Sequence, residues 1–118
     1  MPVTATEKSI TKSIQAWLKT QPEVWQFKVH GGPFQTAGIP DIVGVWAGRF
    51  FALEVKAAKG VPTVLQIKTL EKIEAAGGLV SIVRSLDEVK FLFRVANLES
   101  KMPTTLLERS NAGDLLRS

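Results

Sequence analysis

The sequence DIVGVWAGRFFALEVK occupies residues 41–56 and consists of two apolar runs, Asp41–Trp46 and Phe50–Lys56, on either side of Ala47-Gly48-Arg49. Both runs are rich in β-branched and aromatic residues, which favour strands, and the short glycine-containing segment between them is typical of a tight turn. The stretch therefore predicts a β-hairpin. Because both faces of both strands are largely apolar, we expect helices to cover the sheet on both sides.

Helices and strands are predicted to alternate on both sides of this hairpin, from apolar residues at helical spacing and from shorter apolar runs. The predicted elements are a helix that ends near Thr20 and is opened by a capping box of Thr4 and Glu7, a strand over 24–29, a helix over 63–76, a strand over 79–84 and a helix over 87–95. The resulting order, α-β-β-β-α-β-α, is typical of an α/β fold with a mixed central β-sheet flanked by helices.

The composition bounds the size and the chemistry of the protein. With 118 residues, 45% of them apolar, the chain is expected to form one domain over residues 1–97, followed by a polar C-terminal tail over residues 98–118. There is no cysteine and only one histidine, which excludes disulfides, cysteine-bound metals and thiol catalysis. A metal site would therefore consist of carboxylates and carbonyls, which favour Mg²⁺, Mn²⁺ or Ca²⁺.

Charge and hydropathy indicate the kind of partner. The chain has 15 lysine and arginine residues against 11 aspartate and glutamate residues, and its charge of +4 favours a polyanionic partner such as DNA. No apolar run approaches the length of about 18 residues that a membrane span needs, and the first ten residues lack the apolar segment of a signal peptide. We therefore expect no membrane partner and a cytoplasmic location.

Three charged residues interrupt the apolar hairpin: Asp41, Glu54 and Lys56. A two-residue turn at Gly48-Arg49 would place Asp41 directly opposite Lys56, with Glu54 two residues away on the same strand face. All three side chains would then converge at one end of the hairpin. Two carboxylates that hold a hard cation, beside a lysine that stabilises charge on phosphate, suit metal-assisted phosphodiester hydrolysis. The spacing alone also allows an Asp–Lys ion pair beside a solvated glutamate.

Gly38-Ile39-Pro40-Asp41 followed by Glu54-Val55-Lys56 resembles the Pro-Asp…(Asp/Glu)-x-Lys signature of the PD-(D/E)XK nuclease superfamily. The longer stretch 38–85 resembles the VRR-NUC family, the virus-type replication–repair nuclease domain, in its small stand-alone phage and bacterial form. The shared features include a Gly-Arg-Phe turn, a Pro-Thr-x-x-Gln helix start that contains Gln66, and Gly77-Gly78 before the last strand. The resemblance covers about residues 5–95 and implies a restriction-endonuclease-like core.

The resemblance implies a role for each matching residue. Asp41 and Glu54 match metal ligands, the carbonyl of Val55 a further ligand, Lys56 the catalytic lysine, and Gln66 a glutamine close to the site. It implies Mg²⁺- or Mn²⁺-dependent endonuclease activity on DNA, selective for branched structures such as Holliday junctions, by a homodimer without an organic cofactor in a bacterial or phage-infected cytoplasm. The alternatives are a non-specific or single-strand nuclease, and a DNA-binding module that does not cleave.

Glu7 has two interpretations. At about 100° per residue it falls within the stripe formed by Ile10, Ile14 and Leu18, so it would face the sheet, where a carboxylate needs a partner or a metal ion. Members of the family carry a glutamate at the start of this helix, close to the metal site, which makes Glu7 a candidate metal ligand. The capping box with Thr4 offers a structural role instead.

The remaining candidates carry less weight. His30 precedes a glycine-rich segment and is expected to be an ordinary loop residue. The three tryptophans lie at periodic positions, and we expect Trp17, Trp25 and Trp46 in the core rather than as base-stacking surfaces. Solvent-facing cations that are candidates for contacts with phosphate are Lys28, Arg49, Lys59 and Lys68.

Overall fold

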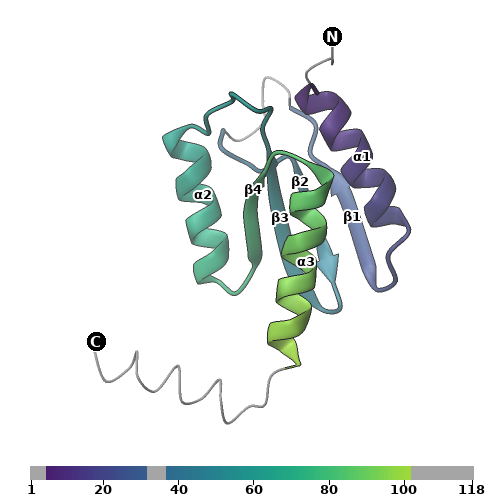
Figure 1. Ribbon diagram of the computed structural model, residues 1–118. Coiled ribbons are helices and arrows are strands. Elements are labelled where there is room, and N and C mark those ends of the chain that lie inside the picture. Colours follow the sequence, from purple (N-terminus) through teal and green to yellow (C-terminus); the bar gives the residue numbers. More distant parts are fainter. Residues whose placement is uncertain (1–4, 32–36, 102–118) are drawn as a thin grey trace.

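The computed structural model of this chain describes residues 5–31 and 37–101. Its elements follow the expected order: α1 (Glu7–Lys19), β1 (Val24–Lys28), β2 (Ile42–Trp46), β3 (Arg49–Val55), α2 (Val64–Ala75), β4 (Leu79–Val83) and α3 (Leu86–Ser100) (Figure 1). Within these ranges, every helix is too short or too polar to traverse a lipid bilayer.

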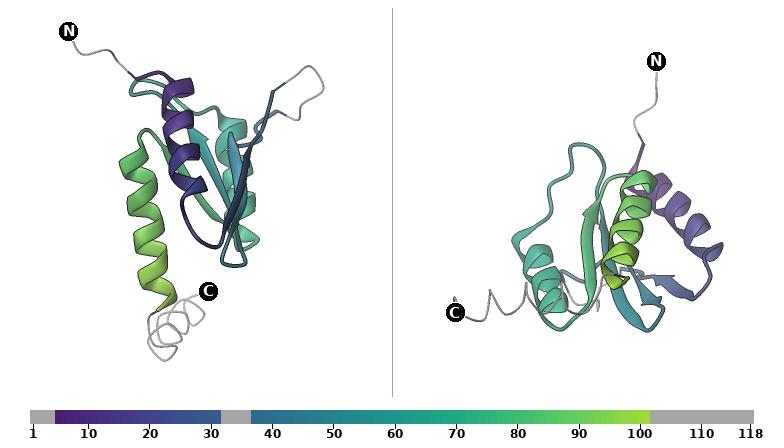
Figure 2. Two further views of the ribbon diagram at one scale, coloured as in Figure 1. Left: turned by 90° about the vertical axis from the view of Figure 1, so that its right-hand side faces the viewer. Right: turned by 60° about the horizontal axis from the view of Figure 1, so that its bottom comes forward.

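A four-stranded sheet forms the centre of the fold, in the order β1-β2-β3-β4. The first three strands are antiparallel neighbours, whereas β4 pairs in parallel with β3 after the chain has crossed over through α2. The helices α1 and α3 pack on one face of the sheet, and α2 packs on the other (Figure 1, Figure 2). The predicted mixed sheet flanked by helices is confirmed.

The core lies between the sheet and the helices α1 and α3. Alternate residues of β3 point to this side, and Phe51, Leu53 and Val55 are fully buried there. They pack with other fully buried residues of the helices and strands, namely Ile14, Leu18, Ile42, Val83 and Val89. The helix α2 contributes less, because Leu70 is the one buried residue among its twelve.

The turn of the hairpin differs from the predicted one. Its two central residues are Ala47 and Gly48, and Trp46 pairs with Arg49. Both central residues have positive φ, 48° for Ala47 and 85° for Gly48, as a type I′ turn requires. This turn type favours glycine at its second position, which explains why the turn is centred one residue earlier than predicted.

The register of the hairpin is accordingly two residues away from the predicted one. Ile42 pairs with Leu53, so the next position places Asp41 opposite Glu54, and the predicted pairing of Asp41 with Lys56 is wrong. A shift of two residues preserves the face on which each side chain lies, because side chains alternate with period two. The three charged residues therefore still share one face of the sheet.

Ala47→Asn is expected to stabilise the protein by about 0.5–1 kcal/mol, because alanine is strained in the left-handed region and asparagine tolerates it. The main-chain N–H of Ala47 donates to the carbonyl of Glu23 (2.9 Å), a bond that does not involve the side chain. Urea denaturation should show a higher midpoint with an unchanged slope. Gly48→Ala, at φ 85°, should lower the midpoint, and a destabilising Ala47→Asn would contradict this turn geometry.

The start of α1 differs from the prediction in a way that matters for Glu7. Thr6 is the N-cap: its hydroxyl accepts from the N–H of Ser9, and the Ser9 hydroxyl accepts from the N–H of Thr6 (both 3.0 Å). The predicted capping box of Thr4 and Glu7 is therefore wrong, and Thr4 itself lies outside the described residues. Glu7 is the first helical residue, and its carboxylate is not used by the cap.

The tryptophans differ in their burial. Trp17 and Trp46 pack against the core, with ring centroids 5.7 and 4.7 Å from that of Phe93. Trp25 is 64% exposed, so its predicted place in the core is wrong. It lies beside Phe27 on the sheet face that α2 covers only in part, because α2 packs on β3 and β4.

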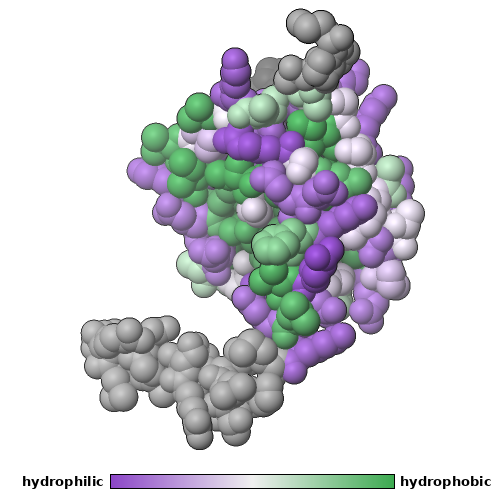
Figure 3. Space-filling view, viewed as in Figure 1, coloured by the Kyte–Doolittle hydropathy of each residue, from purple (hydrophilic) through white to green (hydrophobic). Residues whose placement is uncertain are grey.

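The helix α3 extends further than the predicted 87–95. Its N-cap is Ser85, whose hydroxyl accepts from the N–H of Glu88, and the helix continues to Ser100. The space-filling view shows apolar side chains gathered between α2 and α3 (Figure 3). Ile82 and Phe91 line a groove there, along the edge strand β4.

Candidate active site

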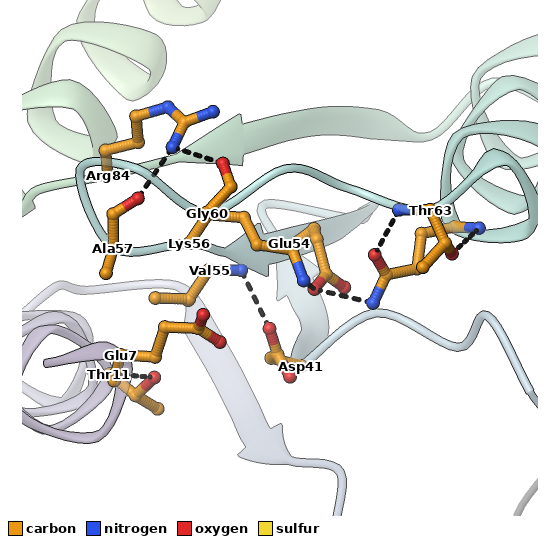
Figure 4. A network of polar contacts seen from close by, with 11 residues as sticks. Glu7, Thr11, Asp41, Glu54, Val55, Lys56, Ala57, Gly60, Thr63 and Arg84 are labelled. Atoms are coloured by element: carbon orange, nitrogen blue, oxygen red, sulfur yellow. Dashed lines mark hydrogen bonds and ion pairs between the residues drawn. The ribbon is translucent and has the colours of Figure 1, made fainter.

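The end of the hairpin brings two carboxylates together. Asp41 directly precedes β2, Glu54 is the penultimate residue of β3, and continuing the strand register places them opposite each other. One oxygen of Asp41, Oδ2, accepts a hydrogen bond from the main-chain N–H of Val55 (2.8 Å), which ties the start of β2 to the end of β3 (Figure 4). Glu54 is only 2% exposed and Asp41 is half-buried, so the site is partly water-excluded.

Lys56 and Gln66 both contact the same oxygen of Glu54. The ammonium Nζ of Lys56 lies 3.4 Å from Glu54 Oε2, and the Gln66 amide Nε2 donates to that oxygen (3.1 Å). Lys56 follows β3 on the same face, whereas Gln66 comes from the first turn of α2. The site therefore combines the hairpin with the helix that follows it in the chain.

A capping box orients Gln66 toward the site. Thr63 is the N-cap of α2, and its hydroxyl accepts from the N–H of Gln66 (3.1 Å). In return, Oε1 of Gln66 accepts from the main-chain N–H of Thr63 (2.8 Å). Because its oxygen is fixed by the cap, the amide nitrogen of Gln66 points at Glu54. The cap therefore brings Gln66, a candidate of the family resemblance, within hydrogen-bond distance of Glu54.

The ionised form of Glu54 is unfavourable unless a cation is bound beside it. Its pKa is raised to about 7, first by burial and then by the neighbouring Asp41 carboxylate, while Lys56 acts in the opposite direction. Its second oxygen, Oε1, is buried and has no hydrogen-bond partner within the described part of the chain. A buried carboxylate oxygen without a partner is costly, so this atom needs either a proton or a cation.

The donor atoms fit a hard divalent cation. Oε1 of Glu54 and the carboxylate of Asp41 are oxygen ligands of the kind that Mg²⁺ and Mn²⁺ prefer. In residues 5–31 and 37–101, no three His, Cys, Asp or Glu side chains gather closely enough to form a complete metal cluster. Main-chain carbonyls such as that of Val55 and water molecules would supply the remaining ligands, as is usual for Mg²⁺.

Glu7 lies at the edge of the site rather than in the core. Its predicted position on the buried stripe of α1 is wrong, because the side chain is exposed at the first helical position. It lines a cavity with Lys8, Thr11, Lys28 and Asp41. In the close view its carboxylate lies on the side of Asp41 and Val55 (Figure 4). The cavity therefore connects the two-carboxylate centre with α1.

The other candidate residues lie in different parts of the fold. Lys28 lines the same cavity as Asp41. Arg49 lies at the opposite end of β3, where its Nε donates to the carbonyl of Gly77 (3.1 Å). His30 is an exposed loop residue, as expected. Arg84, which contacts the turn after Lys56, was missed, because no local motif marks it.

Comparisons with known proteins identify the fold. No protein-family model matches this sequence, and no curated protein matches it significantly. Among solved structures, one described as "VRR_NUC domain protein" matches with a TM-score of 0.61 and 17% sequence identity, over 78% of this chain and 88% of the other. The chain therefore has a VRR_NUC-like α/β fold.

Proposed function

We propose that this chain is a metal-dependent DNA endonuclease that hydrolyses phosphodiester bonds with Mg²⁺ or Mn²⁺. The single observation that carries the proposal is the buried Glu54 carboxylate: one oxygen has no partner among residues 5–31 and 37–101, and the other is held by Lys56 and Gln66. The Asp41 carboxylate on the same face supports it. The VRR_NUC-like fold and the basic charge of the chain are consistent with a nucleic-acid substrate.

Each residue of the site has a defined task in this proposal. Asp41, Glu54 and the Val55 carbonyl would hold the cation, with Glu7 reaching it through water. When bound, the cation polarises the phosphoryl group and lowers the pKa of a water molecule. The Lys56 ammonium stabilises charge that develops on the phosphate or orients the attacking water. Gln66 keeps the Glu54 carboxylate in one orientation through its hydrogen bond.

A cleavage assay on a panel of DNA structures tests this function. Duplex, flap, single-strand and four-way junction substrates are incubated in Mg²⁺, Mn²⁺, Ca²⁺ or chelator, and the strands are separated on a denaturing gel. We expect cleavage in Mg²⁺ and Mn²⁺, and none in chelator. Binding without cleavage of any substrate would favour the DNA-binding module, and equal rates on all four would leave a non-specific nuclease.

We further propose that branched DNA such as a Holliday junction is the preferred substrate. The resemblance to stand-alone VRR-NUC domains supports this preference, and a symmetric junction would suit two sites related by a two-fold axis. The expected result is that four-way junctions are bound more tightly and cut faster than a duplex of equal length. Affinity should fall steeply with salt on both DNAs, because cationic side chains release counterions from the phosphates.

A homodimer is proposed on the basis of an apolar sheet surface, formed by Trp25, Phe27, Val45 and Phe50. These four side chains lie on one face of neighbouring strands, and each is at least 40% exposed. Contiguous exposed apolar residues of this kind mark interfaces. The surface has no charged member, so it suits a second identical surface related by two-fold symmetry better than it suits DNA.

Trp25→Glu is expected to convert the dimer into a monomer, because it would bury an unpaired charge within the interface. Light scattering coupled to gel filtration measures the mass. Phe91→Glu is the matched control: Phe91 is 63% exposed on α3, away from the apolar sheet surface, and its variant should remain dimeric. A wild-type protein that is monomeric at all concentrations would refute the homodimer.

A further inference from the structure

Arg84 lies directly after β4, and its guanidinium group contacts the turn that follows Lys56. One nitrogen, Nη1, donates to the carbonyl oxygens of Ala57 (2.6 Å) and Gly60 (2.8 Å), with a longer contact to that of Ala58 (3.4 Å) (Figure 4). A charged donor makes stronger hydrogen bonds to carbonyls than a neutral donor does. The guanidinium group is therefore the main tie between β4 and this turn.

The parallel pairing of β3 and β4 explains the position of Arg84. Val55 pairs with Val83, and the N–H of Lys56 donates to the carbonyl of Val83 (3.0 Å), so both strands end at the same level. The backbone of Arg84 is fixed in turn by α3, because its N–H donates to the Glu88 carboxylate (2.7 Å). In the described ranges, the guanidinium group has no carboxylate within salt-bridge distance. Its charge is directed at main-chain carbonyls.

The turn at residues 57–60 connects the two groups that hold Glu54. The N–H of Gly60 donates to the carbonyl of Ala57 (2.9 Å), which closes the turn. Gly60 packs on the aliphatic stem of Lys56: a Cβ at Gly60 would lie 3.4 Å from both Cβ and Cδ of the lysine. The chain then runs from Gly60 to Thr63, whose cap orients Gln66.

We propose that Arg84 is a positioning residue, which fixes the 57–60 turn so that the Lys56 ammonium and the Gln66 amide converge on Glu54. Its catalytic consequence rests on the proposed nuclease function. Asp41 and Glu54 are held by the hairpin, and Gln66 adds one hydrogen bond to Glu54. Loss of Arg84 should therefore lower turnover more strongly than cation affinity, whereas a general loss of structure would lower both together.

The test compares Arg84→Ala and Arg84→Lys with the matched control Arg49→Ala. Arg49 also donates a guanidinium hydrogen bond to a main-chain carbonyl, that of Gly77. Gly77 follows the C-terminal end of α2, whereas Gln66 lies at its N-terminal end. For Arg84→Ala we expect kcat to fall about 10- to 100-fold, the loss that a displacement of about 1 Å causes, with a much smaller change in KM and Ca²⁺ affinity. Arg84→Lys, and millimolar guanidinium ion added to Arg84→Ala, should recover part of kcat, whereas NaCl at equal ionic strength should not.

Three outcomes would overturn the proposal: unchanged kcat in Arg84→Ala, an equal loss in Arg49→Ala, or failure of both the lysine variant and guanidinium to recover activity.

A structural measurement tests the positioning role of Arg84 independently of the nuclease function. In the metal-free wild-type protein, nuclear Overhauser contacts should connect the Lys56 side chain with Gly60, and they should vanish in Arg84→Ala alone. If they vanish but the wild-type protein cleaves no DNA, the positioning role stands and the proposed function fails. If they persist, the positioning role is refuted.

Discussion

Asp41→Asn is expected to lower the rate of Mg²⁺-dependent DNA cleavage about a thousandfold while the protein stays folded. Loss of the charge on a metal ligand weakens the stabilisation of the transition state by the cation. The expected cost is about 4 kcal/mol, which corresponds to a thousandfold lower rate. Asparagine keeps the shape, and its oxygen can still accept the hydrogen bond from the N–H of Val55 (2.8 Å). Single-turnover cleavage and thermal unfolding of the same sample measure the two effects separately.

Lys56→Ala is the companion variant, because the lysine is not a ligand. It should lose cleavage about 100-fold or more. We expect Ca²⁺ to strengthen DNA binding, because a cation held between the two carboxylates would remove their repulsion of phosphate, and Lys56→Ala should keep this effect. Asp41→Asn should lose that strengthening. Normal cleavage by Asp41→Asn would refute the assigned metal ligand, and normal cleavage by Lys56→Ala would make the lysine structural.

Glu54→Gln is expected to abolish cleavage and yet to stabilise the metal-free protein at pH 8, by up to about 3 kcal/mol. The pKa of Glu54 is raised from its ordinary 4.5 to about 7 in the folded protein. The folded protein therefore binds this proton more tightly than the unfolded chain does. The resulting contribution to the free energy of unfolding is fully present below pH 4.5 and is lost as the pH rises through 7. Glutamine carries no charge, so the variant avoids this loss.

Urea denaturation in chelator at about pH 5.5 and pH 8 measures the effect. The wild-type protein should lose stability toward pH 8 and regain it when Mg²⁺ is added. Glu54→Gln should respond to neither change, whereas the control Glu71→Gln, at an exposed position on α2, should behave as wild type. A metal-free wild-type protein that is equally stable at both pH values would show that no buried charge is formed at Glu54.

The sequence predicted the convergence of Asp41, Glu54 and Lys56 on one face, although it misplaced the turn. Strand side chains alternate with period two, so an error of two residues in register leaves every face assignment intact. The cap of α1 was misplaced because Thr4 followed by Glu7 matches the Ser/Thr-x-x-Glu/Gln pattern, whereas the observed box has Ser9 where the pattern expects Glu or Gln. A local rule of this kind favours the regular match over a less common one two residues away.

Features that depend on how distant elements pack were not predicted. Trp25 has the periodicity of a core residue, but it is exposed because α2 packs on β3 and β4 and leaves part of the face of β1 uncovered. Arg84 reaches the turn after Lys56 only because the crossover returns β4 beside β3. Neither fact is contained in the residues within a few positions of these side chains.

The helix α2 holds one of the two partners of Glu54, and it is the helix with the fewest buried residues. Leu70 is its one buried residue, while Val64, Leu65 and Ile67 are exposed. Local opening requires the least free energy where few apolar contacts are buried, so α2 should separate from the sheet more often than the strands separate from one another. Each such opening withdraws Gln66 and gives solvent ions a route to Glu54, which is 2% exposed while the helix is in place.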